Sequence, residues 1–362
     1  MNVLLLEDIP DPTEVDAYRK AVEEAGVFEV TIVVHPNSIR AYAWSLQIDS
    51  GIQKTLAQIS VLFNPELLLC LDLRCAWSAV GCEAHAKIAW LGDLNFQTLW
   101  YHALYSYKEG QRPLWKLPID LIRSQYWKKP YRTVLPYFSR IFVASKSSET
   151  ALRRLGMDAS YLPYPWPAKP LHVHSHADDR PTLVFCGTLG ALGSRSSFHV
   201  LIKHIYPALL DYYGQHGFRI RICGRGRLAT WVEDAFRERP EFEILGFVPA
   251  VEPILVKCHA LIVPVEVPVG NRSRILTALS QKLLVIAHSN TALGNPDLKN
   301  GNNCYLADTP REFVDRIRDA VAEPEATHRI AERGFALYTE KFAPTKAVSL
   351  LLNEIAQFHK HS

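Results

Sequence analysis

Two arginines stand close together in a segment that could bind an anion. Arg272 and Arg274 follow Asn271, and an apolar run ends shortly before them at Pro264. Because asparagine is a favoured helix cap, a helix is expected to begin near Asn271, with both arginines in its first turn. The helix dipole disfavours cations there. A phosphate or pyrophosphate held by the backbone N–H groups and the guanidinium groups would account for the pair, and solvated or ion-paired arginines are the alternative.

A glycine-rich loop is the second candidate. It follows an apolar run at residues 183–186, and a helix capped by Ser194 or Ser196 is expected after it, with Arg195 at its start. Glycines allow a backbone to approach a ligand closely, although a simple turn would use the same residues. The loop positions assigned to ligand binding are Gly187, Thr188 and Gly190. A further loop at residues 224–226 lacks the dinucleotide-binding spacing and is interpreted as a plain turn.

The elements that must position these residues are short apolar runs that alternate with helical patterns. The runs are residues 3–6, 30–34, 67–71, 88–91, 141–144, 183–186, 219–223, 243–245, 260–263 and 283–287. Continuous apolar strands separated by helices predict parallel sheets covered on both faces. The fold class is therefore α/β, with two doubly wound, Rossmann-like domains that face a cleft.

A proline-rich stretch predicts the boundary between the two domains. Residues 162–167 carry three prolines, which disfavour both helix and central strand, and a polar, His-rich stretch follows. We expect an N-terminal domain over residues 1–165, a linker over 166–180 and a C-terminal domain over 181–345. A helix over about 346–362 is expected to pack back on the first domain.

The order of short motifs in the C-terminal half resembles glycosyltransferases of the GT-B type, similar to glycosyltransferase family 4. The matching pieces lie at residues 183–187, 219–224, 245–249, 258–264, 270–279, 284–287, 300–308 and 312–313. The resemblance implies a GT-B fold and a hexosyltransferase that moves a sugar from a nucleotide diphosphate donor. It also implies that residues 1–165 form the acceptor-side domain and residues 181–345 the donor-binding domain. The acceptor would be a glycan, a lipid-linked molecule or a small molecule.

The resemblance also implies roles for individual residues. Arg272 and Arg274 match the basic pair that binds the donor diphosphate, and residues 266–271 would lie near the donor sugar. Within that loop the assigned residues are Glu266, Gly270 and Asn271. Phe247 and Val248 would lie beside the nucleotide base. Thr277 stands where the family usually has a glutamate that binds the ribose, and Thr188 stands where a basic residue is common.

A carboxylate of the first domain is the candidate general base. Asp93 follows the run at residues 88–91, so it is expected at the carboxyl end of a strand. A carboxylate within hydrogen-bond reach of an acceptor hydroxyl could take its proton in an inverting reaction. A turn or cap is the alternative for Asp93 and the preferred interpretation for Asp72. The sequence does not decide between inversion and retention.

The composition and charge of the chain indicate which partners and cofactors are expected. The chain has 362 residues, a net charge of +3 and seven cysteines without a zinc-like spacing. A nucleic-acid partner is not expected, nor is a membrane-spanning helix. No Asp-x-Asp pair is present, so we expect no cofactor and no metal, with arginine supplying the positive charge. A cytoplasmic location is expected.

The stretch at residues 100–140 mixes aromatic and basic side chains and allows two interpretations. It could contact an anionic membrane surface or a lipid-linked acceptor, which would make the protein peripheral to the membrane. Alternatively, it is a solvated helical pair whose aromatic side chains pack inward. Two other functions also stay open for the chain: a catalytically weak GT-B relative that binds a ligand or partner, and a sugar-nucleotide epimerase.

Overall fold

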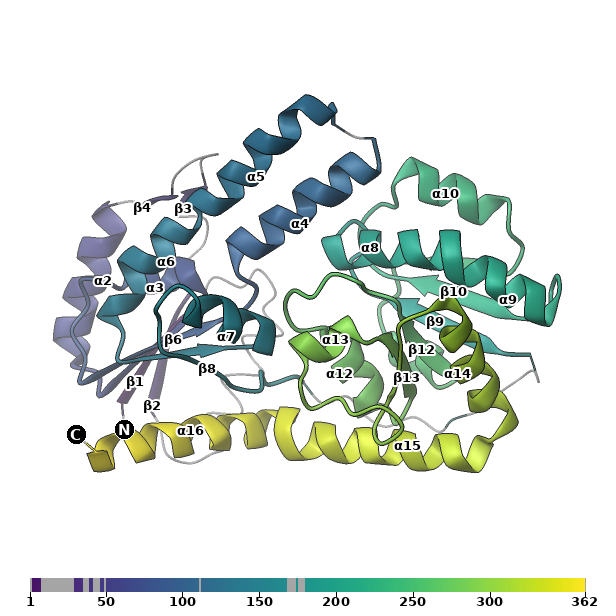
Figure 1. Cartoon of the computed structure of the whole chain (residues 1–362). Coiled ribbons are helices and arrows are strands. Elements are labelled where there is room, and N and C mark those ends of the chain that lie inside the picture. Colours follow the sequence, from purple (N-terminus) through teal and green to yellow (C-terminus); the bar gives the residue numbers. More distant parts are fainter. Residues whose placement is uncertain are drawn as a thin grey trace. The chain divides into compact units, whose positions relative to one another are not determined.

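A computed structural model describes residues 2–7, 29–34, 39–41, 46–48, 50–110, 112–167, 174 and 180–361 of the chain. Most of the expected linker, residues 166–180, lies outside the described residues. The chain divides into two compact units. The first comprises Met1–Pro167, Val269–Asn271 and Ala343–Ser362, and the second comprises Ala168–Pro268 and Arg272–Phe342 (Figure 1).

The first unit is built on a parallel sheet with the strand order β2-β1-β5-β6-β7-β8. Its strands are β1 (Asn2–Glu7), β2 (Glu29–Val34), β5 (Leu67–Leu71), β6 (Ala86–Leu91), β7 (Arg140–Val143) and β8 (Ala159–Tyr161). An antiparallel pair is formed by β3 (Ile39–Ala41) and β4 (Leu46–Ile48). The helices are α2 (Ser50–Phe63), α3 (Leu73–Ser78), α4 (Asn95–Lys108), α5 (Leu117–Tyr126), α6 (Lys128–Val134) and α7 (Lys146–Arg153).

Strand β5 shows why the central strands consist of unbroken apolar runs. Successive side chains of a strand point to opposite faces. Leu68 and Cys70 therefore join one hydrophobic cluster, with residues of α3 and α6, while Leu69 and its alternate neighbours join another. Leu351 of the C-terminal helix α16 (Pro344–His361) packs into that second cluster with Trp90 of β6. Both faces are covered, so no position of the strand can be polar.

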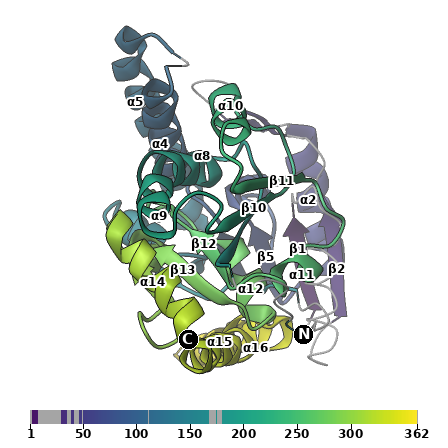
Figure 2. The ribbon, with the colours of Figure 1, turned by 90° about the vertical axis from the view of Figure 1, so that its right-hand side faces the viewer.

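The second unit is built on another six-stranded parallel sheet, in the order β11-β10-β9-β12-β13-β14. Figure 2 shows β11, β10, β12 and β13 of this sheet. Its strands are β9 (Thr182–Cys186), β10 (Arg219–Cys223), β11 (Phe242–Gly246), β12 (Ala260–Val263), β13 (Leu284–His288) and β14 (Tyr305–Ala307). The helices are α8 (Leu192–Val200), α9 (Tyr206–Tyr213), α10 (Thr230–Arg237), α11 (Glu252–Leu255), α12 (Ser273–Ser280), α13 (Asn290–Gly294), α14 (Pro310–Ala322) and α15 (Pro324–Leu337).

The order of the second sheet creates a switch point between β9 and β12. From β9 the chain moves outward through β10 to β11, and then returns to the other side of β9 with β12. Loops that leave β9 and β12 at their carboxyl ends turn away from each other and leave room between them, which is where open α/β sheets bind ligands.

The sequence prediction of the fold class is confirmed. Each of the ten predicted strands is present, with ends that differ from the prediction by no more than two residues. The sequence missed β3, β4, β8 and β14, which have three residues each and are too short to show a pattern. Among the described residues, no helix combines the length and apolar character needed to cross a bilayer.

Candidate donor-binding site

In the loop after β9, the backbone comes close to the segments at the ends of β10 and β11. Gly187 has a φ of +143° and its N–H donates to Cys223 at 3.2 Å, while Gly224 donates to Gly246 at 2.8 Å. A β-carbon on Gly224, whose φ is +154°, would stand 1.7 Å from the Gly187 carbonyl oxygen. Glycine is therefore required at Gly224 both by its backbone conformation and by space.

The helix that carries the arginines begins later than the sequence predicted. Helix α12 starts at Ser273, so Arg272 occupies the cap position and Asn271 lies before it. The prediction of Asn271 as the cap is wrong, because Asn295, distant in sequence, accepts a hydrogen bond from the Arg272 N–H at 3.2 Å. Of the two arginines, only Arg274 lies in the first helical turn.

Helix α8 also begins differently. It starts at Leu192 with Ala191 at the cap position and no side-chain cap, so neither Ser194 nor Ser196 has the predicted role. Ser194 instead donates its hydroxyl hydrogen to the Thr188 carbonyl oxygen at 2.7 Å, which ties the first turn of the helix to the glycine-rich loop.

Arg274 reaches from α12 to this loop and is held there. Its guanidinium lies over the Phe185 ring at 4.6 Å from the centroid, and its Nη2 donates to Ser194 Oγ at 3.1 Å. A β-carbon on Gly187 would stand 2.6 Å from the same Nη2. The glycine thus makes room for a cation against the backbone at the end of β9.

The surroundings of Arg274 indicate that an anion would stabilise its positive charge. Its Nη1 is buried and has no hydrogen-bond partner among the described residues. Burial is the main reason that the pKa of Arg274 falls to about 10, and the nearby Arg272 cation lowers it too. A buried, incompletely paired cation is costly. An anion between the two arginines would offset that cost.

Arg272, at the cap position of α12, approaches the first turn of α8. Its Nη2 donates to the Val267 carbonyl oxygen at 2.8 Å. Its Nη1 would lie 3.1 Å from a β-carbon on Gly193, in the first turn of α8. Two guanidinium groups and the N-terminal turns of α8 and α12 therefore meet at the switch point. Backbone N–H groups and paired arginines are the usual elements of a phosphate site.

The loop at residues 224–226, interpreted from the sequence as a plain turn, also lines this region. The Leu189 N–H donates to the Arg225 carbonyl oxygen at 2.7 Å, and the exposed Gly190 lies near Gly226. The Arg225 guanidinium lies 5.3 Å from the centroid of the Phe247 ring, which is 59% exposed. The signal in the sequence was the pair Gly224 and Gly226 directly after β10. Its meaning could be recognised only once the sheet order had placed β10 next to β9.

The other predicted donor residues lie in this unit with less direct evidence. Arg195 of α8 is buried, and Thr188 is exposed on its loop. Val248 is partly buried beside Phe247, and Glu266 offers its carbonyl oxygen to Asn290 Nδ2 at 2.6 Å. Thr277 donates its hydroxyl hydrogen to the Ser273 carbonyl oxygen at 3.3 Å. The roles of these residues in binding stay predictions.

Asp93 of the first unit lies just after the end of β6 and is exposed. Helix α4 is capped at Leu94, so Asp93 is not its cap residue. Its carboxylate lies beside Gly270, which has a φ of +72° and belongs to the same compact unit. Asp72, in contrast, has the structural role that the sequence favoured, because its carboxylate accepts from the Leu73 N–H at 2.6 Å at the start of α3.

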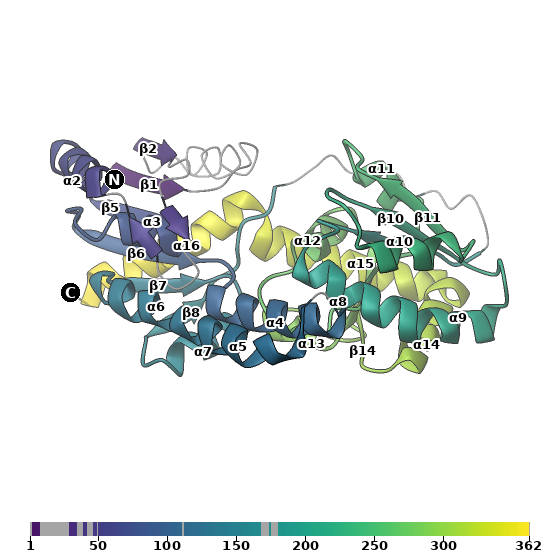
Figure 3. The same ribbon diagram turned by 90° about the horizontal axis from the view of Figure 1, so that it is seen from above.

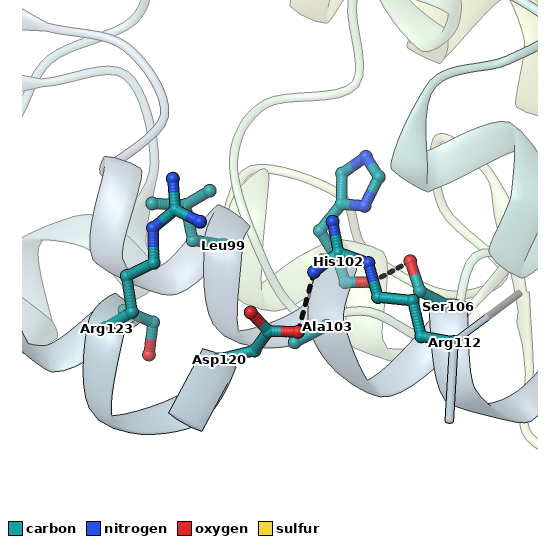
Figure 4. A pocket seen from close by; sticks show the side chains of 8 residues that line it. Leu99, His102, Ala103, Ser106, Arg112, Asp120 and Arg123 are labelled. Carbon is teal, nitrogen blue, oxygen red and sulfur yellow. Dashed lines mark hydrogen bonds and ion pairs between the residues drawn. The ribbon is translucent and has the colours of Figure 1, made fainter. Parts of the chain in front are cut away.

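A pocket that the sequence did not predict lies between α4 and α5 in the first unit (Figure 4). Its volume is about 340 Å³. Arg112 donates to Asp120 at 2.6 Å, and the Tyr107 hydroxyl donates to the same carboxylate at 2.9 Å. Burial acts to raise the pKa of Asp120, but these two hydrogen bonds outweigh it and the pKa falls. His102 and Arg123 also line the pocket.

Comparisons with known proteins bear on the family resemblance and on the fold of the chain. Residues 180–323 match the family model of glycosyl transferases group 1. No curated protein sequence matches the chain. Among solved structures, a glycosyltransferase from Rickettsia africae has a TM-score of 0.70 and 11% identity, and covers 100% of this chain and 99% of that one. HepE from Anabaena, solved in complex with UDP, has a TM-score of 0.64 and 11% identity over 99% and 100% of the two chains.

TarM is a larger neighbour. It has a TM-score of 0.62 and 10% identity, and the match covers 85% of this chain but only 59% of TarM. At identities this low the likeness establishes the fold, which is GT-B, and the predicted resemblance to GT-B glycosyltransferases is confirmed.

Proposed function

We propose that this protein is a glycosyltransferase that moves a hexosyl group from a nucleoside diphosphate sugar to an acceptor hydroxyl. The observation that carries the proposal is the pair of arginines at the switch point of the second sheet. Arg274 is held against Gly187 and Ser194 with one buried nitrogen unpartnered among the described residues, and Arg272 reaches the first turn of α8. A diphosphate suits these groups in charge and size.

In this reaction the bond between the donor's anomeric carbon and the diphosphate oxygen breaks, and the acceptor oxygen forms a new bond to that carbon. Negative charge grows on the leaving diphosphate. Arg272 and Arg274 would stabilise that charge in the transition state, in the way that metal ions do in other transferases. Arg274 requires little reorganisation, because its stacking on Phe185 and its bond to Ser194 already fix it.

The acceptor proton needs a base, and we assign that role to Asp93 for an inverting reaction. An exposed carboxylate directly after a strand end supports this assignment. In a retaining reaction the leaving diphosphate itself would take the proton, and Asp93 would then position the acceptor.

A uridine nucleotide is the first donor to test, because HepE was solved with UDP and with UDP-glucose. Calorimetry with UDP, GDP, ADP and TDP, carried out in EDTA, should show saturable binding of one nucleotide by the wild-type chain. Arg272→Ala should weaken that binding by about tenfold or more and greatly reduce turnover, while circular dichroism stays unchanged. Unchanged binding and turnover in that variant would remove Arg272 from the site.

A non-catalytic binding protein is the second candidate, and one residue favours it. Thr277 replaces the ribose-binding glutamate of the family, and its hydroxyl already bonds to the helix backbone. Nucleotide binding without transfer of sugar to any of a panel of acceptors would support this candidate. Interconversion of sugar nucleotides without an acceptor would instead identify an epimerase.

A further inference from the structure

Helix α5 carries a second apolar stripe that faces solvent. Trp115 in the turn before the helix, Ile119, Ile122 and Tyr126 recur at helical spacing, so they share one face of the helix. Their exposed fractions are 68%, 46%, 56% and 56%. Leu114, next to Trp115, is 73% exposed. Figures 1 and 3 show α5 alongside α4 in the helical pair.

The opposite face of α5 already supplies the contact with the rest of the unit. Ser124 is buried and donates its hydroxyl hydrogen to the Leu121 carbonyl oxygen at 2.6 Å, and α5 packs along α4. A surface helix needs one apolar face for such packing. The exposed stripe is therefore an addition that the fold does not use, and contiguous exposed apolar side chains mark a contact surface.

The charges beside the stripe identify its partner. Lys116 and Arg123 are seven residues apart, so they form a basic row along one side of it. Lys116 Nζ lies 4.9 Å from the centroid of the Trp115 ring. Residues 108–132 carry seven lysines or arginines and two carboxylates, a net charge of +5, whereas the whole chain carries only +3. The positive charge of the protein is thus concentrated in the segment of the sequence that carries this stripe.

We propose that the outer face of α5 docks on an anionic lipid bilayer. Apolar side chains with a tryptophan and a tyrosine suit the boundary between headgroups and acyl chains, and flanking lysines and arginines suit anionic headgroups. A second copy of the chain would bring two strongly basic surfaces together, so the charges disfavour self-association through this face. The inference goes beyond the proposed function, and its test needs neither donor nor acceptor.

The test is sedimentation of the full chain with vesicles. Vesicles of phosphatidylcholine with about one third phosphatidylglycerol should bind the protein, pure phosphatidylcholine should bind it at least about tenfold more weakly, and about 0.5 M NaCl should weaken the binding to the anionic vesicles. The paired change Trp115→Ser and Ile122→Ser should lower binding to the anionic vesicles by about tenfold or more. Lys116→Glu should also lower that binding by about tenfold, because Lys116 is exposed and lies beside the Trp115 ring.

The matched control changes two other exposed apolar residues of the first unit. Val61 and Leu62 of α2 are 59% and 86% exposed, and Val61→Ser with Leu62→Ser should leave vesicle binding unchanged. Equal binding to both kinds of vesicle, or an equal loss in the α2 control, would overturn the proposal. So would light scattering that shows a wild-type dimer and a monomeric Trp115→Ser/Ile122→Ser variant, since the stripe would then be a self-interface.

Discussion

The carboxyl edges of the two sheets are built in opposite ways. At the second sheet, glycines after β9 and β10 bring backbones into contact, and the Arg274 cation is packed into the space that Gly187 leaves. At the first sheet, Gly92 follows β6 in the same way, but a β-carbon there would meet nothing within 4 Å. The charged groups directly after β5 and β6 are the carboxylates Asp72 and Asp93. We call the edge of the second sheet the cationic cradle, formed by Gly187, Gly224, Arg272 and Arg274. We call the edge of the first sheet the acidic rim, formed by Asp72, Gly92 and Asp93.

The largest expected effect tests the rigidity of the cradle. Gly224→Ala should lower the free energy of unfolding by about 4 kcal/mol or prevent folding, because the added methyl group would overlap the Gly187 carbonyl and the residue has a φ of +154°. Gly92→Ala, at the open rim, should stay within about 0.5 kcal/mol of wild type. Urea denaturation measures both. Equal losses in the two variants would show that the edges do not differ in packing.

This contrast also shows what the sequence could and could not predict. The central strands were predictable because both faces are buried, which forces unbroken apolar runs such as the one in β5. The start of α12 was not, because Asn295 supplies the contact to Arg272 from a distant part of the chain. The role of the loop at residues 224–226 depended on β10 lying next to β9, which is a property of the sheet order and not of local sequence.

The next effect tests whether the cationic edge is shaped for a ligand at the expense of stability. Arg274→Met should lower kcat/KM by about 10²- to 10³-fold, since the charge that stabilises the leaving diphosphate is lost. The free protein should nevertheless be as stable as wild type or about 1 kcal/mol more stable. The substitution replaces a buried cation, one nitrogen of which has no hydrogen-bond partner in the described part of the chain, with an apolar side chain that can still pack on Phe185.

The control for this substitution is another arginine of the second unit. Arg316 stacks over Tyr305 at 5.0 Å from the ring centroid and has a buried Nε without a hydrogen-bond partner among the described residues, but it pairs with Asp319 at 3.4 Å. Arg316→Met should leave nucleotide binding unchanged. If Arg274→Met destabilised the free protein and bound the nucleotide normally, Arg274 would be a structural cation and the cradle interpretation would be wrong.

A third substitution tests the acidic rim. Asp93→Asn should lower kcat by about 10²-fold in an inverting reaction, because the amide cannot accept the acceptor proton, while the nucleotide dissociation constant stays the same. Asp72→Asn should lower kcat little, since asparagine can still accept the Leu73 N–H hydrogen bond at the start of α3. Steady-state kinetics and calorimetry separate the two quantities. Full activity of Asp93→Asn would exclude it as the base.

The smallest effect concerns the outer margin of the cradle, where Phe247 meets Arg225. We expect the nucleotide base beside Phe247, so Phe247→Ala should weaken nucleotide binding by about three- to tenfold through the loss of aromatic contact. Tyr212 is the control: it is 54% exposed, similar to Phe247 at 59%, and it lies near the end of α9, before β10 begins. Because that end of α9 leads to the amino edge of the sheet, Tyr212→Ala should leave calorimetric binding unchanged. If both variants bound like wild type, base recognition would be confined to backbone groups and Phe247 would contribute no affinity.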